Sequence, residues 1–373
     1  MDLDSYLHNH PCLRLFSSSD QEAVLNLAGK SPMKVGGIEL LYDRSPDYQA
    51  LLQCQGEKLQ TILGEEEERL RLVYSFSTAK RWIHGKLESC AYIGDFRTDQ
   101  SRKAAMIWRK YYAEFLSVLK SDSNYDSPKY VLTAILKKNK EAFLNFVGSQ
   151  KDFGFRYDFL SELNMINVYK QWPWGGRSPI QTQRASKEDE LALLNFLNER
   201  ERDKIFGSNF EVPNNDWNLR EKTWPGYFIE NFLIQKNVDG KIIACTLPWD
   251  PSFAKRMTVT KAPFLMRFIF RALNAVGFSM PTVGESLKTL YMTHLNIDTN
   301  IDEALSVQSF LHYLFKHHRK YHMISFADEA RLVDRLRGFI YQKVGVMLYT
   351  VALTNETPLL TESKRVGFEM GLV

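Results

Sequence analysis

The chain has 373 residues, of which 44% are hydrophobic, 13% aromatic and 25% charged. A chain of this length and composition can bury a large core, so intrinsic disorder is excluded and we expect two domains or one large one. The formal net charge of +4 is spread along the chain without a nucleic-acid-binding motif, so we expect no nucleic-acid partner. The four cysteines stand far apart, which excludes a disulfide framework and a cysteine-rich zinc site.

The amino-terminal segment has neither a positively charged stretch nor an apolar stretch of the kind found in signal peptides, and we predict a cytoplasmic protein. The most apolar segment is Ala262–Phe278, which Arg267 and Arg271 interrupt. It is too short and too charged for a transmembrane helix, so we expect no stable membrane insertion. We interpret it as a buried or groove-lining helix, with a helix on a membrane surface as the alternative.

The first half of the chain alternates strands and helices. Apolar residues alternate along Arg69–Ile83, and the turn residues His84 and Gly85 predict a hairpin with a returning strand at Lys86–Arg97. The other elements predicted in this half are a strand at Cys12–Phe16, helices at Asp20–Leu27 and Pro46–Gln55, a strand at Lys58–Leu63, a helix at 102–119, a strand at Tyr130–Leu136, a helix at Asn139–Val147 and a hairpin within Phe153–Lys170.

The segment Gln171–Pro179 is rich in Pro, Gly and Trp, which is typical of a linker. A second series of elements follows it. These are a strand at Gln181–Arg184, a helix from Ser186 to Asp203, a hairpin of Tyr227–Lys236 and Lys241–Leu247, an inserted helix at Phe264–Val276, a strand at Ser286–Ile297, a helix at Ile301–Arg319, a strand at His322–Phe326, a helix at Glu329–Gly338, a strand at Val344–Leu353 and an edge strand within Pro358–Val373.

The same order of strands and helices therefore occurs twice. We predict a mixed α/β protein of two similar domains, each a mostly antiparallel mixed sheet flanked by helices. The predicted boundaries are residues 1–171 for the first domain, 172–179 for the linker and 180–373 for the second domain.

One segment of the first half, Tyr92–Ile107, combines the end of a strand with the start of a basic helix. A helix N-terminus offers unpaired N–H groups and a positive dipole end, which can bind a pyrophosphate. The segment resembles the GNAT superfamily of acyl-CoA-dependent N-acyltransferases, where the fourth strand leads into a phosphate-binding loop and helix. On this register Arg102 stands for the family's Arg or Gln, and Ala105 and Ile107 for its small residues.

A second segment, Val131–Ala142, also resembles that superfamily. The family's fifth strand is followed by Asn-x-x-Ala, here Asn139 and Ala142, and the Asn contacts pantetheine. Many members place a Tyr four residues later to protonate the leaving thiolate. This chain has Phe146 there, and a phenyl ring has no proton to donate. Tyr157, Tyr111 and Tyr112 are the substitutes that we consider.

The resemblance implies a set of site residues. The carboxylate on the fourth strand, Asp95, is the candidate general base, with Glu88 as the alternative. The other interpretation of Asp95 is an ion pair with Arg97, Arg81 or Arg102. The strand backbone around Ile93–Phe96 would pair with pantetheine. The residues assigned to acyl-CoA binding are Ile93, Gly94, Phe96, Arg97, Arg102, Lys103, Ala104, Ala105, Met106, Ile107, Asn139, Ala142 and Phe146.

The second half resembles the same fold more faintly. Its equivalent loop carries Asp298, Asp302 and Glu303 and no basic residue, and these carboxylates would repel a pyrophosphate. We therefore expect the second domain to lack an acyl-CoA site. The nearby His312, His317, His318 and His322 do not share one helix face, so we expect no metal site.

The leading hypothesis is an N-acyltransferase that moves an acyl group, acetyl by default, from acyl-CoA to a small-molecule or peptide amine by direct attack. One alternative is a non-catalytic acyl-CoA-binding or scaffold protein, as Phe146 suggests. Another is an aminoacyl transferase, a class in which tandem GNAT-like domains also occur. The oligomeric state is left open by the sequence.

Overall fold

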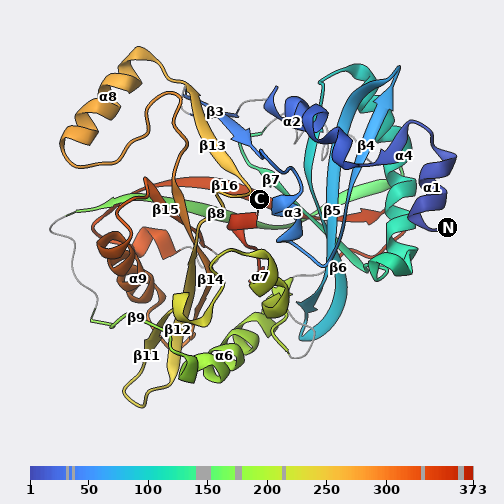
Figure 1. The fold of residues 1–373 in the computed structure, drawn as a ribbon. Helices are drawn as coiled ribbons and strands as arrows, with labels where there is room; N and C mark the ends of the chain where they lie inside the picture. The colour runs from blue at the N-terminus through green and yellow to red at the C-terminus, as the bar shows by residue number, and fades with distance from the viewer. Residues whose placement is uncertain are drawn as a thin grey trace.

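The computed structural model describes residues 1–30, 33–35, 38–139, 153–172, 179–211, 216–328, 332–359 and 365–372. One 13-stranded mixed sheet runs through these residues, in the order β1-β4-β5-β6-β7-β16-β8-β15-β14-β12-β11-β9, with β10 paired to β5 (Figure 1). Its strands are β1 (Leu13–Leu15), β4 (Lys58–Glu66), β5 (Arg69–Ile83), β6 (Lys86–Thr98), β7 (Tyr130–Leu136), β8 (Phe155–Gln171), β9 (Gln183–Arg184), β10 (Gly207–Ser208), β11 (Leu233–Lys236), β12 (Ile242–Trp249), β14 (Thr289–Ile297), β15 (Met323–Asp328) and β16 (Phe339–Leu353).

A second, three-stranded sheet has the order β13-β3-β2 and joins the two halves of the chain. Its strands are β2 (Met33–Val35), β3 (Ile38–Asp43) and β13 (Arg256–Lys261). The described α-helices are α1 (Leu3–Asn9), α2 (Gln21–Gly29), α3 (Ala50–Gln53), α4 (Arg102–Ser121), α6 (Glu190–Arg202), α7 (Asp216–Thr223), α8 (Phe264–Ala275) and α9 (Glu303–His317). None of these helices has the length and apolar character needed to span a bilayer.

The side chains of each strand alternate between the two faces of the sheet. Because both faces carry apolar side chains, helices cover both of them. In β5, Leu72, Tyr74 and Phe76 belong to the core that includes α4. The intervening Val73 belongs to the core that includes α2. The alternation that predicted β5 from the sequence therefore buries both of its faces.

The last strand of each half, β8 and β16, pairs with a strand of the other half. β16, from the end of the chain, pairs antiparallel with β7 of the first half, and β8, from the first half, pairs antiparallel with β15 of the second half. β8 and β16 also pair with each other, from Phe339↔Gln171 to Leu353↔Phe155 (Figure 1). The halves thus share one continuous sheet, and the predicted domain division at residues 171 and 180 stays a prediction.

Most predicted elements are present among the described residues, and the following predictions are wrong in whole or in part. Phe155–Gln171 is one long strand, because β15 and β16 pair with its two edges. The helix after Ser45 is only the short α3, and Leu332–Arg335 is a 3₁₀ turn. The end of the chain forms no edge strand in its described part; Val366 bridges Ile205, and Met370–Leu372 is a 3₁₀ turn.

Candidate functional site

The first half opens between β6 and β7. These two parallel strands pair over three residues only, ending at Tyr92↔Leu132. Past that point within the two strands, the side-chain hydroxyl of Thr133 donates to the carbonyl oxygen of Ile93 at 2.8 Å. The backbone of β6 beyond Ile93 is therefore not paired with β7, which leaves room for a ligand to pair there.

A bulge in β6 follows this opening. The register of β5 and β6 shifts between Ser75↔Gly94 and Val73↔Arg97, and Asp95 has φ of 53°. The side chain of Asp95 accepts a hydrogen bond from the guanidinium of Arg44 at 2.7 Å, and the Arg44 side chain is only 1% exposed. The bulge thus turns one carboxylate towards a buried cation, and sequence reasoning named Arg97, Arg81 and Arg102 as partners but missed Arg44.

The N-terminus of α4 lies close to the same bulge in the chain. Ser101 caps it, since its hydroxyl accepts from the N–H of Ala104 at 3.1 Å. Lys103 is paired with Glu66 and Glu67, at 3.0 and 2.8 Å. Arg102 is exposed at this helix end. The local charge is therefore less positive than the sequence around residue 102 indicates.

The structure brings together only part of the predicted acyl-CoA set. Ile93, Gly94, Phe96 and Arg97 lie on β6 at the bulge, and a Cβ at Gly94 would come within 2.7 Å of the Tyr92 ring. Arg102–Ile107 lie inside α4 rather than in a loop before it, with Ala104 and Ile107 in the core and Ala105 and Met106 exposed.

The alternative base, Glu88, and the pantetheine-contacting Asn139 do not lie at the bulge in β6. Glu88 lies seven residues before Asp95 on β6, about 23 Å away at the usual strand rise, and it pairs with Lys129 at 2.7 Å. Asn139 follows a turn, where its N–H donates to the carbonyl of Leu136 at 2.8 Å. Ala142 and Phe146 lie outside the described residues.

The second half repeats the opening and the bulge. β14 and β15 pair in parallel over three residues, ending at Tyr291↔Ser325, and the register of β12 and β14 then shifts. His294, three positions after Tyr291, has φ of 53°, as Asp95 has three positions after Tyr92. The two bulges therefore occupy equivalent places in the two halves.

The side chains around His294 differ from those around Asp95. His294 is 2% exposed, and its Nε2 faces the guanidinium of Arg220 and the hydroxyl of Tyr227. Burial, together with Arg220, lowers the pKa of His294 well below its usual value. His294 is therefore a neutral imidazole in the folded protein.

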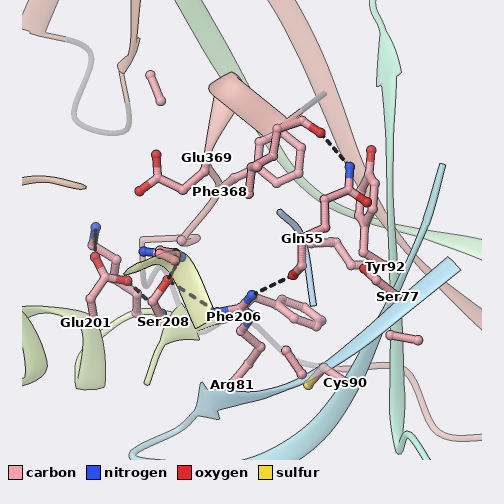
Figure 2. A pocket seen from close by; sticks show the side chains of 18 of the residues that line it. Gln55, Ser77, Arg81, Cys90, Tyr92, Glu201, Phe206, Ser208, Phe368 and Glu369 are labelled. Carbon is pink, nitrogen blue, oxygen red and sulfur yellow. Dashed lines mark hydrogen bonds and ion pairs between the residues drawn. The ribbon is translucent and has the colours of Figure 1, made fainter. Parts of the chain in front are cut away.

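A cavity of about 90 Å³ lies between the two halves. Its walls come from β5 and β6 on one side, from α6, β10 and β14 on the other, and from the tail 367–372 (Figure 2). Glu369, on the tail, and Arg220 both line it. The N–H of His294 donates to the Glu369 carboxylate at 2.9 Å, so the second bulge lies against the cavity.

Glu369 is the carboxylate at this cavity whose proton affinity is increased. Burial raises its pKa, against the opposing effect of Arg220 and of the His294 N–H. Two other acidic side chains nearby are already paired: Glu201 with Lys204 at 2.9 Å and Asp216 with Arg81 at 2.5 Å. A carboxylate with a raised pKa in a cavity has the properties of a general base.

No family model matches the chain, and no curated protein matches it in sequence. Solved structures do match. N-myristoyltransferase from Saccharomyces cerevisiae with bound myristoyl-CoA matches with a TM-score of 0.56 and 9% identity, over 96% of this chain and 89% of that chain. A GCN5-related N-acetyltransferase from Sphaerobacter thermophilus matches with a TM-score of 0.53 and 11% identity, over 96% and 97%.

The chain has the GNAT fold. The match extends over almost the whole chain and so includes both halves. The tandem arrangement of the halves is consistent with a myristoyltransferase-like fold. At 9–11% identity the similarity establishes the fold alone, so the reaction has to be inferred from the residues of the site.

Within this GNAT fold, sequence reasoning found the strand that carries the bulge but missed the residues that surround it. Arg44, Arg220, His294 and Glu369 come from four separate segments, and none lies in a motif. The signal that was available was the repeat: aligning Tyr92 with Tyr291 places His294 opposite Asp95. Among the described residues, no group of three or more His, Cys, Asp or Glu side chains is arranged so that it could hold a metal ion.

Proposed function

We propose that the protein is an N-acyltransferase that uses acyl-CoA as the donor and an amine as the acceptor. The observation that carries this proposal is the opening between β6 and β7 with the bulge at Asp95. Unpaired strand backbone at this place can bind the amide groups of pantetheine. The N-terminus of α4, with Arg102, would then face the pyrophosphate. The acyl-transferring neighbours with the same fold support this assignment.

The acceptor would enter the cavity between the halves. Direct transfer needs a base that takes a proton from the ammonium form of the amine before or during its attack on the thioester carbonyl. Glu369 suits this role because its raised pKa favours proton uptake and it faces the cavity. Asp95 remains the alternative base, although its bond to Arg44 occupies one carboxylate oxygen.

The donor site is tested by thermal unfolding with acetyl-CoA, free CoA and a long-chain acyl-CoA. A ligand at 100 times its dissociation constant stabilises the folded state by about 2.7 kcal/mol. We expect a rise in Tm with an acyl-CoA that is reduced in Arg102→Glu and kept in Arg319→Glu, an exposed Arg in the second half. If no CoA compound shifts Tm, the proposal fails.

The chemistry is tested by release of free CoA in the presence of a panel of amines, including amino acids and short peptides. We expect Glu369→Gln to lower kcat by at least about 100-fold with the acyl-CoA-induced Tm shift retained. If Asp95→Asn has that effect and Glu369→Gln has none, Asp95 is the base. Acyl-CoA binding without turnover for any amine would favour the non-catalytic alternative.

A further inference from the structure

We propose that α8 and the loop that follows it form a surface that docks on an anionic membrane, with the helix lying in the headgroup region. This proposal does not depend on the acyltransferase function. The sequence favoured a buried or groove-lining helix here, and the structure shows that the helix is not buried. The side chains of Phe264, Leu265 and Phe268 are 87%, 66% and 64% exposed.

The exposed apolar residues form one continuous face. At 100° per residue, Phe264, Phe268, Leu265 and Ile269 fall within an arc of about 140° on the helix. Phe270 lies outside that arc and is buried. The helix therefore packs on the protein through the side of Phe270 and leaves its main apolar face in solvent. A continuous exposed apolar face of this kind marks an interaction site.

The segment that contains α8 begins after Val259 and ends before Gly284, and backbone hydrogen bonds join its two ends. The N–H of Gly284 donates to the carbonyl of Val259 at 2.8 Å, and the N–H of Val259 donates to that of Glu285 at 3.1 Å. The ammonium of Lys170 on β8 donates to the carbonyl of Val276 at 2.7 Å. Figure 1 shows the helix at the periphery, beyond β13. The apolar face is thus presented outward from a fixed support.

Charge decides which partner fits this face. Residues 261–288, which include α8 and the loop that follows it, contain four Lys and Arg and a single acidic residue, Glu285. On the helix, Arg267 and Arg271 border the apolar arc on the side next to Phe264. Arginine side chains at the edge of an apolar face can extend to lipid phosphates while the Phe and Leu side chains enter the acyl boundary. An anionic lipid surface therefore suits both the apolar face and the arginines beside it.

The test is co-sedimentation of the purified full chain with vesicles of phosphatidylcholine, with and without phosphatidylserine. We expect binding to the mixed vesicles that is weakened at least about tenfold in the double variant Phe264→Ser, Phe268→Ser. Arg271→Glu should weaken it by about fivefold or more. The matched control is Leu191→Ser, Val238→Ser, which removes two apolar side chains that are 72% and 101% exposed elsewhere.

Tm of the unbound variants provides the folding control, because the substituted side chains are exposed and should change it little. The proposal is overturned if the wild-type chain does not sediment with the mixed vesicles, or if the α8 variants sediment as well as the control. It is also overturned if sedimentation velocity without vesicles shows a dimer that the α8 double variant dissolves, because a second copy would then cover the face.

Discussion

The bulge at Asp95 and the bulge at His294 share a backbone arrangement and differ in the side chain that the bulge itself carries. Each follows three parallel pairs and has φ of 53°. The first places a carboxylate against the buried Arg44, and the second places a neutral imidazole against Arg220. The comparison shows that the fold conserves the opening of the sheet in both halves, while the side chains decide what each opening can bind.

The helix that follows each bulged strand differs in the same way. Ser101, a neutral residue, caps α4. Asp302 caps α9, accepting from the N–H groups of Ala304 and Leu305, and it also pairs with Arg335. A carboxylate at the helix N-terminus already satisfies the donors and the dipole that a phosphate would use. This difference supports the proposal that a pyrophosphate would bind to the first half.

The largest expected effect concerns Lys255, which lies near Arg44 and Asp95. Burial, with Arg44, lowers the pKa of Lys255 from 10.5 to about 7. The unfolded chain then holds one more proton than the folded chain between these two values, so stability rises with pH across that window, by on the order of 5 kcal/mol. Urea unfolding from pH 7 to 10 should show Lys255→Met losing this rise, with the exposed Lys241→Met unchanged. Equal slopes in all three proteins would contradict it.

A second prediction breaks the first bulge. Arg44→Leu leaves the Asp95 carboxylate without its partner, and loss of one member of a buried pair costs about 3–5 kcal/mol. The pair Arg256–Asp43, with side chains 38% and 26% exposed, provides the control. There Arg256→Ala should cost at most about 1 kcal/mol. Similar losses of unfolding free energy in the two variants would show that the Arg44 pair is not special.

A third prediction concerns how the free energy of unfolding depends on pH through His294, at the second bulge, and Glu369 beside it. Below pH 6.5 the unfolded state protonates His294 while the folded state resists protonation, so stability falls as the pH is lowered there, by at most about 1.4 kcal/mol per pH unit. The raised pKa of Glu369 acts in the opposite direction, because the folded state takes up its proton first. His294→Asn, which tolerates positive φ, should therefore lose less stability than the wild type between pH 6.5 and 5.

The control for this prediction is Glu369→Gln, which should lose more stability than the wild type over the same range. The measurement is the free energy of unfolding at several pH values in one buffer system. If His294→Asn and Glu369→Gln change the slope in the same direction, the two groups do not have the opposed titrations described above.

The smallest expected effect compares the two helix caps. Ser101→Ala and Asp302→Ala should each lower the free energy of unfolding by about 1 kcal/mol. The loss should be larger for Asp302→Ala, because Asp302 accepts from two N–H groups and pairs with Arg335. An equal or smaller loss for Asp302→Ala would show that the two helix starts are energetically alike.

Local patterns in the sequence predicted the elements well where each element is decided by its own residues. The bounds of β5 and β7 agree with the alternation and turn signals, and α4 begins at Arg102, directly after its cap. The resemblance of Tyr92–Ile107 and Val131–Ala142 to the GNAT superfamily also predicted this fold, which the structural matches confirm. Periodicity and caps act within a few residues, so they can be recognised without knowledge of the tertiary contacts.

What only the tertiary structure decided are the contacts between distant segments. β8 is one strand because β15 and β16 pair with its edges, and β16 comes from the other end of the chain. Arg44 reaches Asp95 from 51 residues away, and Glu369 meets His294 across 75. The exposure of α8 is likewise a matter of what packs against it. Sequence patterns fix which face of an element is apolar, but its partner is selected by the whole fold.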